Sequence, residues 1–160
     1  MKELIVATLE RTIIFPTENQ YILPTTSYNS FAELIGYLKS EAHPALTSSI
    51  ITFNYDIALD VAMFRNGQGP VYGFGPEVRT NSPTKLLKLH GSLNWAVRSD
   101  SGEVQPLTLQ EYFSKYSYQG WDKRGTCHIQ IGSQLQEYYS KHTEIKVNTE
   151  PVIVPPTWNK

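Results

Sequence analysis

The chain has 160 residues, enough for one domain with its own hydrophobic core. Its 14 basic and 15 acidic residues give a formal net charge of −1 without any basic patch, so we expect no nucleic-acid partner. The single cysteine, Cys127, excludes an intrachain disulfide framework and a multi-cysteine zinc cluster. No apolar run approaches the roughly 18 residues of a membrane span, and none resembles a signal peptide. We therefore expect a cytoplasmic protein with no membrane partner and no metal site.

The first third of the chain has helical character with one loop. Apolar residues at helical spacing predict an amphipathic helix over 2–14, followed by a Pro-, Thr- and Asn-rich loop over 16–29. Ser30 and Glu33 have the spacing of a capping box, which predicts a second helix over 31–41. The apolar face of that helix is expected to consist of Phe31, Leu34, Ile35 and Leu38.

The middle of the chain predicts two strands with a helix between them. Buried strands are expected over 49–54 and 85–89, with a helix over 56–64. The segment 66–84 is rich in Gly and Pro and is expected to be irregular. This order of elements indicates an α/β fold.

Beyond residue 90 the pattern changes. Segments 94–98 and 103–105 flank a turn over 99–102, which predicts a hairpin. The polar, Tyr-rich stretch 108–150 carries weak helical signals near 109–116 and 134–142, and a short extended segment is expected over 151–156. We interpret 96–150 as an insertion or a small subdomain.

Polar motifs follow both central strands. Thr52-Phe53-Asn54-Tyr55-Asp56 ends the first, and Leu89-His90-Gly91-Ser92 follows the second. The carboxyl ends of parallel strands form the crevice where α/β proteins bind ligands, so Asn54 and His90 are expected to meet there.

Each motif also has a purely structural interpretation. Asn54 and Asp56 are typical of an Asx-turn or a helix N-cap, and His90 could be an imidazole bonded to a backbone carbonyl. In the functional interpretation His90 is a general base, since histidine titrates near neutral pH. Gly91 would then allow the close approach of a ligand or an unusual backbone angle.

The two motifs resemble those of the sirtuin family. Thr52-Phe53-Asn54-Tyr55-Asp56 is similar to its Thr-x-Asn-x-Asp motif, and Leu89-His90-Gly91-Ser92 is similar to its His-Gly motif. The longer segments 51–56 and 88–95, together with 154–160, resemble bacterial sirtuin-like domains more than deacetylases.

This resemblance implies an α/β, Rossmann-like (sirtuin-type) domain with a mostly parallel, partial sheet, in which NAD is the substrate. It implies NAD⁺ hydrolysis at the bond between nicotinamide and ribose, as in bacterial anti-phage defence effectors. His90 would be the catalytic base, and Asn54 would hold the ribose and the attacking water. The remaining NAD-binding residues that the resemblance implies are Thr52, Asp56, Gly91 and Ser92.

Two departures from the family qualify this expectation. The Gly-Ala-Gly-x-Ser phosphate loop and the later Gly-rich segment are absent, so we expect residues 1–160 to be a partial domain that relies on self-association or on the remainder of a longer chain. One cysteine cannot build the zinc ribbon of the deacetylases, which favours NAD hydrolysis over deacetylation. The alternative function is a non-catalytic module that binds NAD or ADP-ribose, or that serves as an interaction surface.

Overall fold

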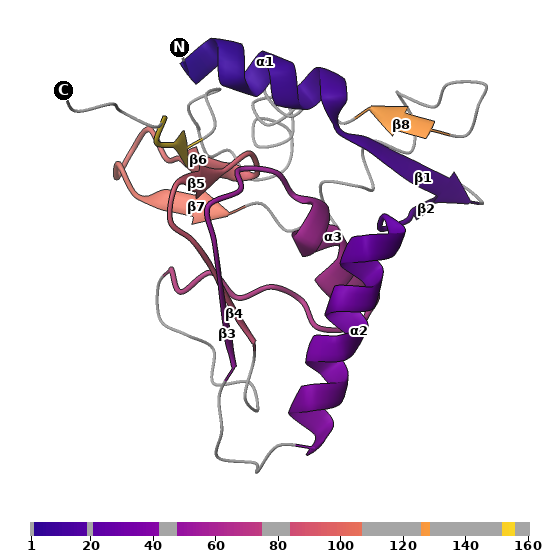
Figure 1. Cartoon of the computed structure of the whole chain (residues 1–160). Helices are drawn as coiled ribbons and strands as arrows, with labels where there is room; N and C mark the ends of the chain where they lie inside the picture. The colour runs from indigo at the N-terminus through magenta and orange to yellow at the C-terminus, as the bar shows by residue number, and fades with distance from the viewer. Residues whose placement is uncertain are drawn as a thin grey trace, which may run out of the picture.

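The computed structural model describes residues 2–18, 21–41, 48–74, 84–106, 126–128 and 152–155 (Figure 1). Its helices are α1 (Lys2–Thr12), α2 (Thr26–Glu41) and α3 (Ala58–Arg65). Its strands are β1 (Ile14–Glu18), β2 (Tyr21–Ile22), β3 (Ser49–Thr52), β4 (Lys85–Lys88), β5 (Gly91–Ser92), β6 (Trp95–Val97), β7 (Val104–Pro106), β8 (Thr126–His128) and β9 (Val152–Ile153). The predicted α/β class is confirmed. Within these residues no helix is both long and apolar enough to cross a membrane.

A parallel pair of strands with a connecting helix forms the centre of the fold. Strands β3 and β4 pair in parallel, with Ser49 opposite Lys85 and Thr52 opposite Lys88. Helix α3 lies between them in the chain, as the sequence predicted, and all of these elements end within two residues of the predicted bounds. Val71 adds an isolated parallel bridge to Lys85, so the predicted irregular segment also contributes to the sheet.

The other described strand pairs are antiparallel, which differs from the predicted, mostly parallel sheet. Strand β1 pairs with both β2 and β8, β5 pairs with β9, and β6 pairs with β7. The β1–β2 and β6–β7 connections are too short for the crossover that a parallel pair requires. The β6–β7 hairpin itself was predicted, and Gly102 supplies a positive φ of 71° at its turn.

The hydrophobic core lies between α2, α3 and the parallel pair. Its buried cluster is formed by Ala32, Leu59, Ala62, Met63 and Leu86. Helix α3 supplies most of this cluster and is buried from its first residue through Met63. Both α2 and α3 lie on the same side of β3 and β4 (Figure 1). Ile51 of β3 is exposed, as are Phe53 and Leu89, which directly follow β3 and β4.

The predicted start and apolar face of the second helix are wrong. The helix begins at Thr26, because the Thr25 carbonyl already accepts a bond from the Asn29 amide and Thr25 takes the N-cap position. Glu33 accepts a hydrogen bond from the Asn29 side chain instead of capping Ser30.

The α2 residue buried in the core is the small Ala32, and Tyr28 packs against the core in part. Ala32 is fully buried, and a Cβ added to Gly36 would stand 2.6 Å from the side chain of Gln68. This lets α2 lie close against the end of α3, where Gln68 donates to the Ala32 carbonyl. Of the predicted face, Ile35 is half-buried, whereas Phe31, Leu34 and Leu38 are exposed.

The predictions for the two ends of the chain are confirmed in part. The predicted helix over 2–14 is confirmed as α1, but part of the predicted loop 16–29 is strand, in β1 and β2. The extended segment near 151–156 contains β9. The weak helical signals near 109–116 and 134–142 lie outside the described residues.

Gly91 is required where β5 meets β9. Its φ is +86°, and a Cβ added there would stand 2.0 Å from the carbonyl oxygen of Val152. The unusual backbone angle expected at Gly91 is therefore confirmed, and the group that approaches it closely is the β9 backbone.

We predict that Gly91→Ala lowers the free energy of unfolding by about 3 kcal/mol or more, because it combines a left-handed φ with overpacking. Gly102→Ala is the matched control, since φ there is +71° and nothing lies within 4 Å of an added Cβ. It should cost only about 1–2 kcal/mol, the price of the backbone angle. Urea unfolding of both variants checks this, and equal losses would contradict the close packing of β5 on β9.

Candidate functional site

The loops that follow β3 and β4 lie side by side and are bonded through their backbones. The Leu89 amide donates to the Thr52 carbonyl at 3.0 Å, and the Leu93 amide donates to the Tyr55 carbonyl at 3.0 Å. Parallel pairing of β3 and β4 places both loops at the same end of the pair. The predicted juxtaposition of the two motifs is thus found at the level of the backbone.

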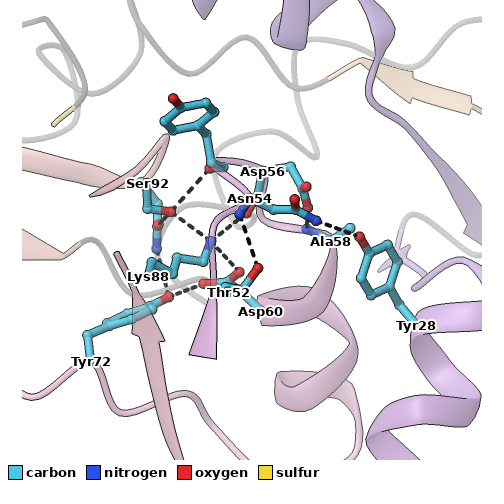
Figure 2. Close-up of polar contacts among 11 residues, drawn as sticks. Tyr28, Thr52, Asn54, Asp56, Ala58, Asp60, Tyr72, Lys88 and Ser92 are labelled. Atoms are coloured by element: carbon cyan, nitrogen blue, oxygen red, sulfur yellow. Dashed lines mark hydrogen bonds and ion pairs between the residues drawn. The ribbon is translucent and has the colours of Figure 1, made fainter. Parts of the chain in front are cut away.

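Asn54 is exposed at the tip of the first loop. Its amide N–H donates to Thr52 Oγ1 at 3.1 Å, which fixes the turn out of β3. Its side-chain Nδ2 lies 3.4 Å from the hydroxyl of Tyr28 on α2, so the carboxamide is directed toward α2 (Figure 2). Asn54 remains accessible to a bound molecule, whereas the Thr52 hydroxyl is used within the turn.

Asp56 forms an Asx-turn just before helix α3, whose N-cap residue is Ile57. The Asp56 Oδ1 accepts a hydrogen bond from the amide of Ala58, two residues further on, at 2.8 Å. The structural interpretation of Asp56 is therefore confirmed. A carboxylate at this position also interacts favourably with the dipole of α3.

His90 lies between two aromatic rings of the neighbouring loop. The centroid of its ring is 5.1 Å from that of Phe53 and 5.9 Å from that of Tyr55. These residues flank Asn54 in sequence, but no described contact joins the side chains of Asn54 and His90. Among the described residues the His90 ring has no hydrogen-bond partner, unlike the backbone-bonded imidazole of the structural interpretation. The ring is half-buried and in part accessible.

The backbone of His90 is fixed by the segment that follows β9. The Val154 amide donates to the His90 carbonyl at 2.8 Å. The Tyr55 hydroxyl donates to the Val154 carbonyl at 2.9 Å. Val154 therefore connects the two loops, although it lies far from both in the sequence.

A closed ring of polar side chains, all of them buried except the half-buried Tyr72, lies beneath the loops (Figure 2). The Lys88 Nζ lies 2.7 Å from Asp60 Oδ2, and the two side chains are 1% and 0% exposed. Tyr72 donates to Asp60 Oδ1 and accepts from Asn94 Nδ2. Ser92 Oγ donates to Asn94 Oδ1 at 2.6 Å and accepts from Lys88 Nζ at 2.8 Å, which closes the ring. Ser92, predicted to bind NAD, is fully buried, and its hydroxyl is used in this ring.

Burial, and after it the charge of nearby carboxylates, raises the pKa of two tyrosines near the site. For Tyr72, burial is the main cause and the Asp60 carboxylate adds to it, so its pKa lies well above the usual value. For Tyr28, burial again comes first, followed by the charge of Asp56, and the pKa is raised. Both phenols therefore stay neutral at physiological pH and keep a proton to donate.

The predicted site residues did not include Lys88, Asp60, Tyr72, Asn94 or Tyr28. Two of them carry a signal in the sequence. Lys88 shares with Leu86 the inward alternation of a strand, and a lysine in such a position requires a buried partner. Asp60 likewise stands among apolar residues of α3, where a carboxylate requires a buried partner of its own.

Comparison with models of known protein families and with curated proteins gave no match for this chain. Among the residues that the structure describes, no three His, Cys, Asp or Glu side chains are grouped as metal ligands. A function is therefore assigned from the geometry and chemistry of the two loops.

We predict that Asp56→Ala lowers the free energy of unfolding by about 1 kcal/mol, because the Ala58 amide loses its acceptor. Asp56→Asn keeps an oxygen at the same place and should retain most of that stability. Chemical denaturation of both variants measures the difference. Equal losses would show that the charge matters and that the hydrogen bond to Ala58 does not.

We predict that Lys88→Met lowers the free energy of unfolding by about 3–5 kcal/mol, because it leaves the Asp60 carboxylate buried without a cation. The double variant Lys88→Met/Asp60→Asn removes both charges and should recover most of the loss. Chemical denaturation of the single and double variants measures both free energies of unfolding. A double variant no more stable than Lys88→Met would contradict a buried ion pair.

Proposed function

We propose that the chain belongs to a Rossmann-like, sirtuin-type domain that hydrolyses NAD⁺ between nicotinamide and ribose, as a bacterial defence effector. Asn54 and His90 act on the substrate in this proposal. The observation that carries it is the bonding of the Asn54 loop to the His90 loop at the carboxyl end of a parallel β–α–β unit. Such strand ends are where open α/β sheets bind nucleotides.

The chemistry of the reaction matches the residues that remain accessible. Departure of nicotinamide leaves positive charge on the ribose, and water must then be held in position and deprotonated. Asn54 is exposed and carries a carboxamide that can orient a ribose hydroxyl or water. His90 is half-buried and in part accessible, and its imidazole can take the proton of the attacking water as a general base.

The other residues predicted to contact NAD shape the two loops. The side chains of Thr52, Asp56 and Ser92 each make a hydrogen bond within the protein, and Gly91 lies against β9. Their backbones still lie beside Asn54 and His90. We propose that they contribute to NAD binding through the shape of the loops.

The internal hydrogen bonds of Thr52, Asp56 and Ser92 favour a second candidate, a non-catalytic module that binds NAD or ADP-ribose. Hydroxyl and carboxylate groups that already have partners in the protein are less available to a ligand. The two candidates differ in turnover, because the module would bind NAD and leave it intact.

The test is nicotinamide release from NAD⁺ by the wild-type chain, His90→Gln and Asn54→Ala. His90→Gln keeps the size and polarity of the side chain but removes its basicity. We expect release to fall by about 10²–10⁴-fold in this variant, the usual contribution of a general base. Asn54→Ala should also lose release, because water and ribose are no longer oriented.

The control is Leu34→Ala, a truncation of an exposed residue of α2. It should release nicotinamide at the wild-type rate, and circular dichroism should show that every variant is folded. Release that persists unchanged in His90→Gln would contradict the proposed role of His90. NAD binding by calorimetry without any release would establish the non-catalytic module instead.

A further inference from the structure

Lys88 holds both functional loops with one ammonium group. Its Nζ donates to the backbone carbonyl of Asp56, in the loop that carries Asn54. It also donates to Ser92 Oγ at 2.8 Å, just beyond His90. Figure 2 shows the ammonium between these two partners, with Asp60 below it.

Stability alone does not explain a lysine in this position. Lys88 lies in a strand beside buried apolar residues, where removal of its charge from water costs several kcal/mol, as for any buried ion. A buried ion pair can often be replaced by apolar residues at no loss of stability. What an apolar side chain cannot do is bond to two loops at once.

The ring of side chains fixes the direction of the ammonium. Asp60 anchors Nζ from helix α3, and Tyr72 and Asn94 hold Asp60 and Ser92 in their places. Lys88 therefore has one geometry in which all its bonds are made. Each of these bonds is charge-assisted and thus stronger than a neutral one.

We propose that Lys88 is a positioning residue, which joins the loops of Asn54 and His90 and sets their relative placement for the reaction. The proposal rests on the proposed NAD hydrolysis. It requires no contact between Lys88 and the substrate, because the ammonium is buried and acts through the Asp56 carbonyl and Ser92.

The experiment compares Lys88→Met/Asp60→Asn with Tyr72→Phe. The double variant removes the ammonium and its counter-charge together, so that no lone charge is buried. Tyr72→Phe breaks the ring on the side away from the loops and leaves the bonds of Lys88 to both loops in place. The two variants thus separate joining of the loops from the general stability of the ring.

Two readouts are measured on each protein. The first is kcat and KM for nicotinamide release. The second is hydrogen exchange of the Leu93 amide, which bonds across the two loops, relative to the Leu86 amide, which bonds to Val71. General destabilisation raises the exchange of both amides, whereas separation of the loops raises that of Leu93 alone.

We expect the double variant to lose about 10²-fold in kcat, as catalytic groups displaced by about 1 Å do. Its Leu93 amide should exchange roughly tenfold faster or more relative to Leu86, as loss of a charged hydrogen bond implies. Tyr72→Phe removes one bond to Asp60 and none to Lys88, so it should lower kcat far less than the double variant and leave the ratio of the two exchange rates close to the wild-type value. Wild-type values of both readouts in the double variant, or equal changes in the two variants, would overturn the proposal.

Remaining outcomes are also decisive. If the wild-type chain releases no nicotinamide, the proposed function fails, and the exchange ratio alone decides whether Lys88 joins the loops. If the double variant does not fold, Ser92→Ala replaces it, because it removes the hydroxyl that Lys88 meets in the His90 loop. The same two readouts then apply, with the same expected directions.

Discussion

The buried ion pair between Lys88 and Asp60 is the constraint on which the arrangement of the site depends. An ammonium and a carboxylate that have left water must meet each other and fill their remaining hydrogen bonds, or the fold loses several kcal/mol. Tyr72 donates to Asp60, and Ser92 and the Asp56 carbonyl accept from Lys88. Asn94 then joins Tyr72 to Ser92. Because the network is closed, displacement of any member leaves a buried polar atom without a partner, so strand β4, helix α3 and the two loops share one arrangement.

Most polar side chains near the two loops are bonded to one another in the ring, so few of them remain accessible to a ligand. Asn54 is exposed beside Tyr28, and His90 lies half-buried between Phe53 and Tyr55. The surrounding residues serve mainly to hold the backbone. Under the proposed function, activity therefore depends on the side chains of Asn54 and His90 and on the rigidity of the residues beneath them.

The sequence predicted the central β–α–β unit because its signals are local. Apolar runs end in polar turns, and Asp56 forms an Asx-turn between β3 and α3. The predicted start of α2 was wrong, because a capping-box spacing at Ser30 competed with an earlier cap at Thr25. The predicted buried face of α2 was also wrong, since contact with α3 selects the small residues Ala32 and Gly36, a choice that local hydrophobicity does not reveal. The pairing of Lys88 with Asp60 and Tyr72 joins distant positions, which strand and helix periodicity cannot register.

The contacts of Val154 have a consequence for the order in which the protein folds. Tyr55 and Val154 are 99 positions apart, and Val154 is also bonded to the His90 backbone. Contacts between distant parts of a chain form late, because the entropy of closing a long loop is lost before any contact compensates for it. During synthesis, the core around α3 and β4 can form while residue 154 has not yet been made. The His90 loop receives its last restraint only when that segment arrives, so the two loops reach their final arrangement after the rest of the described core is in place.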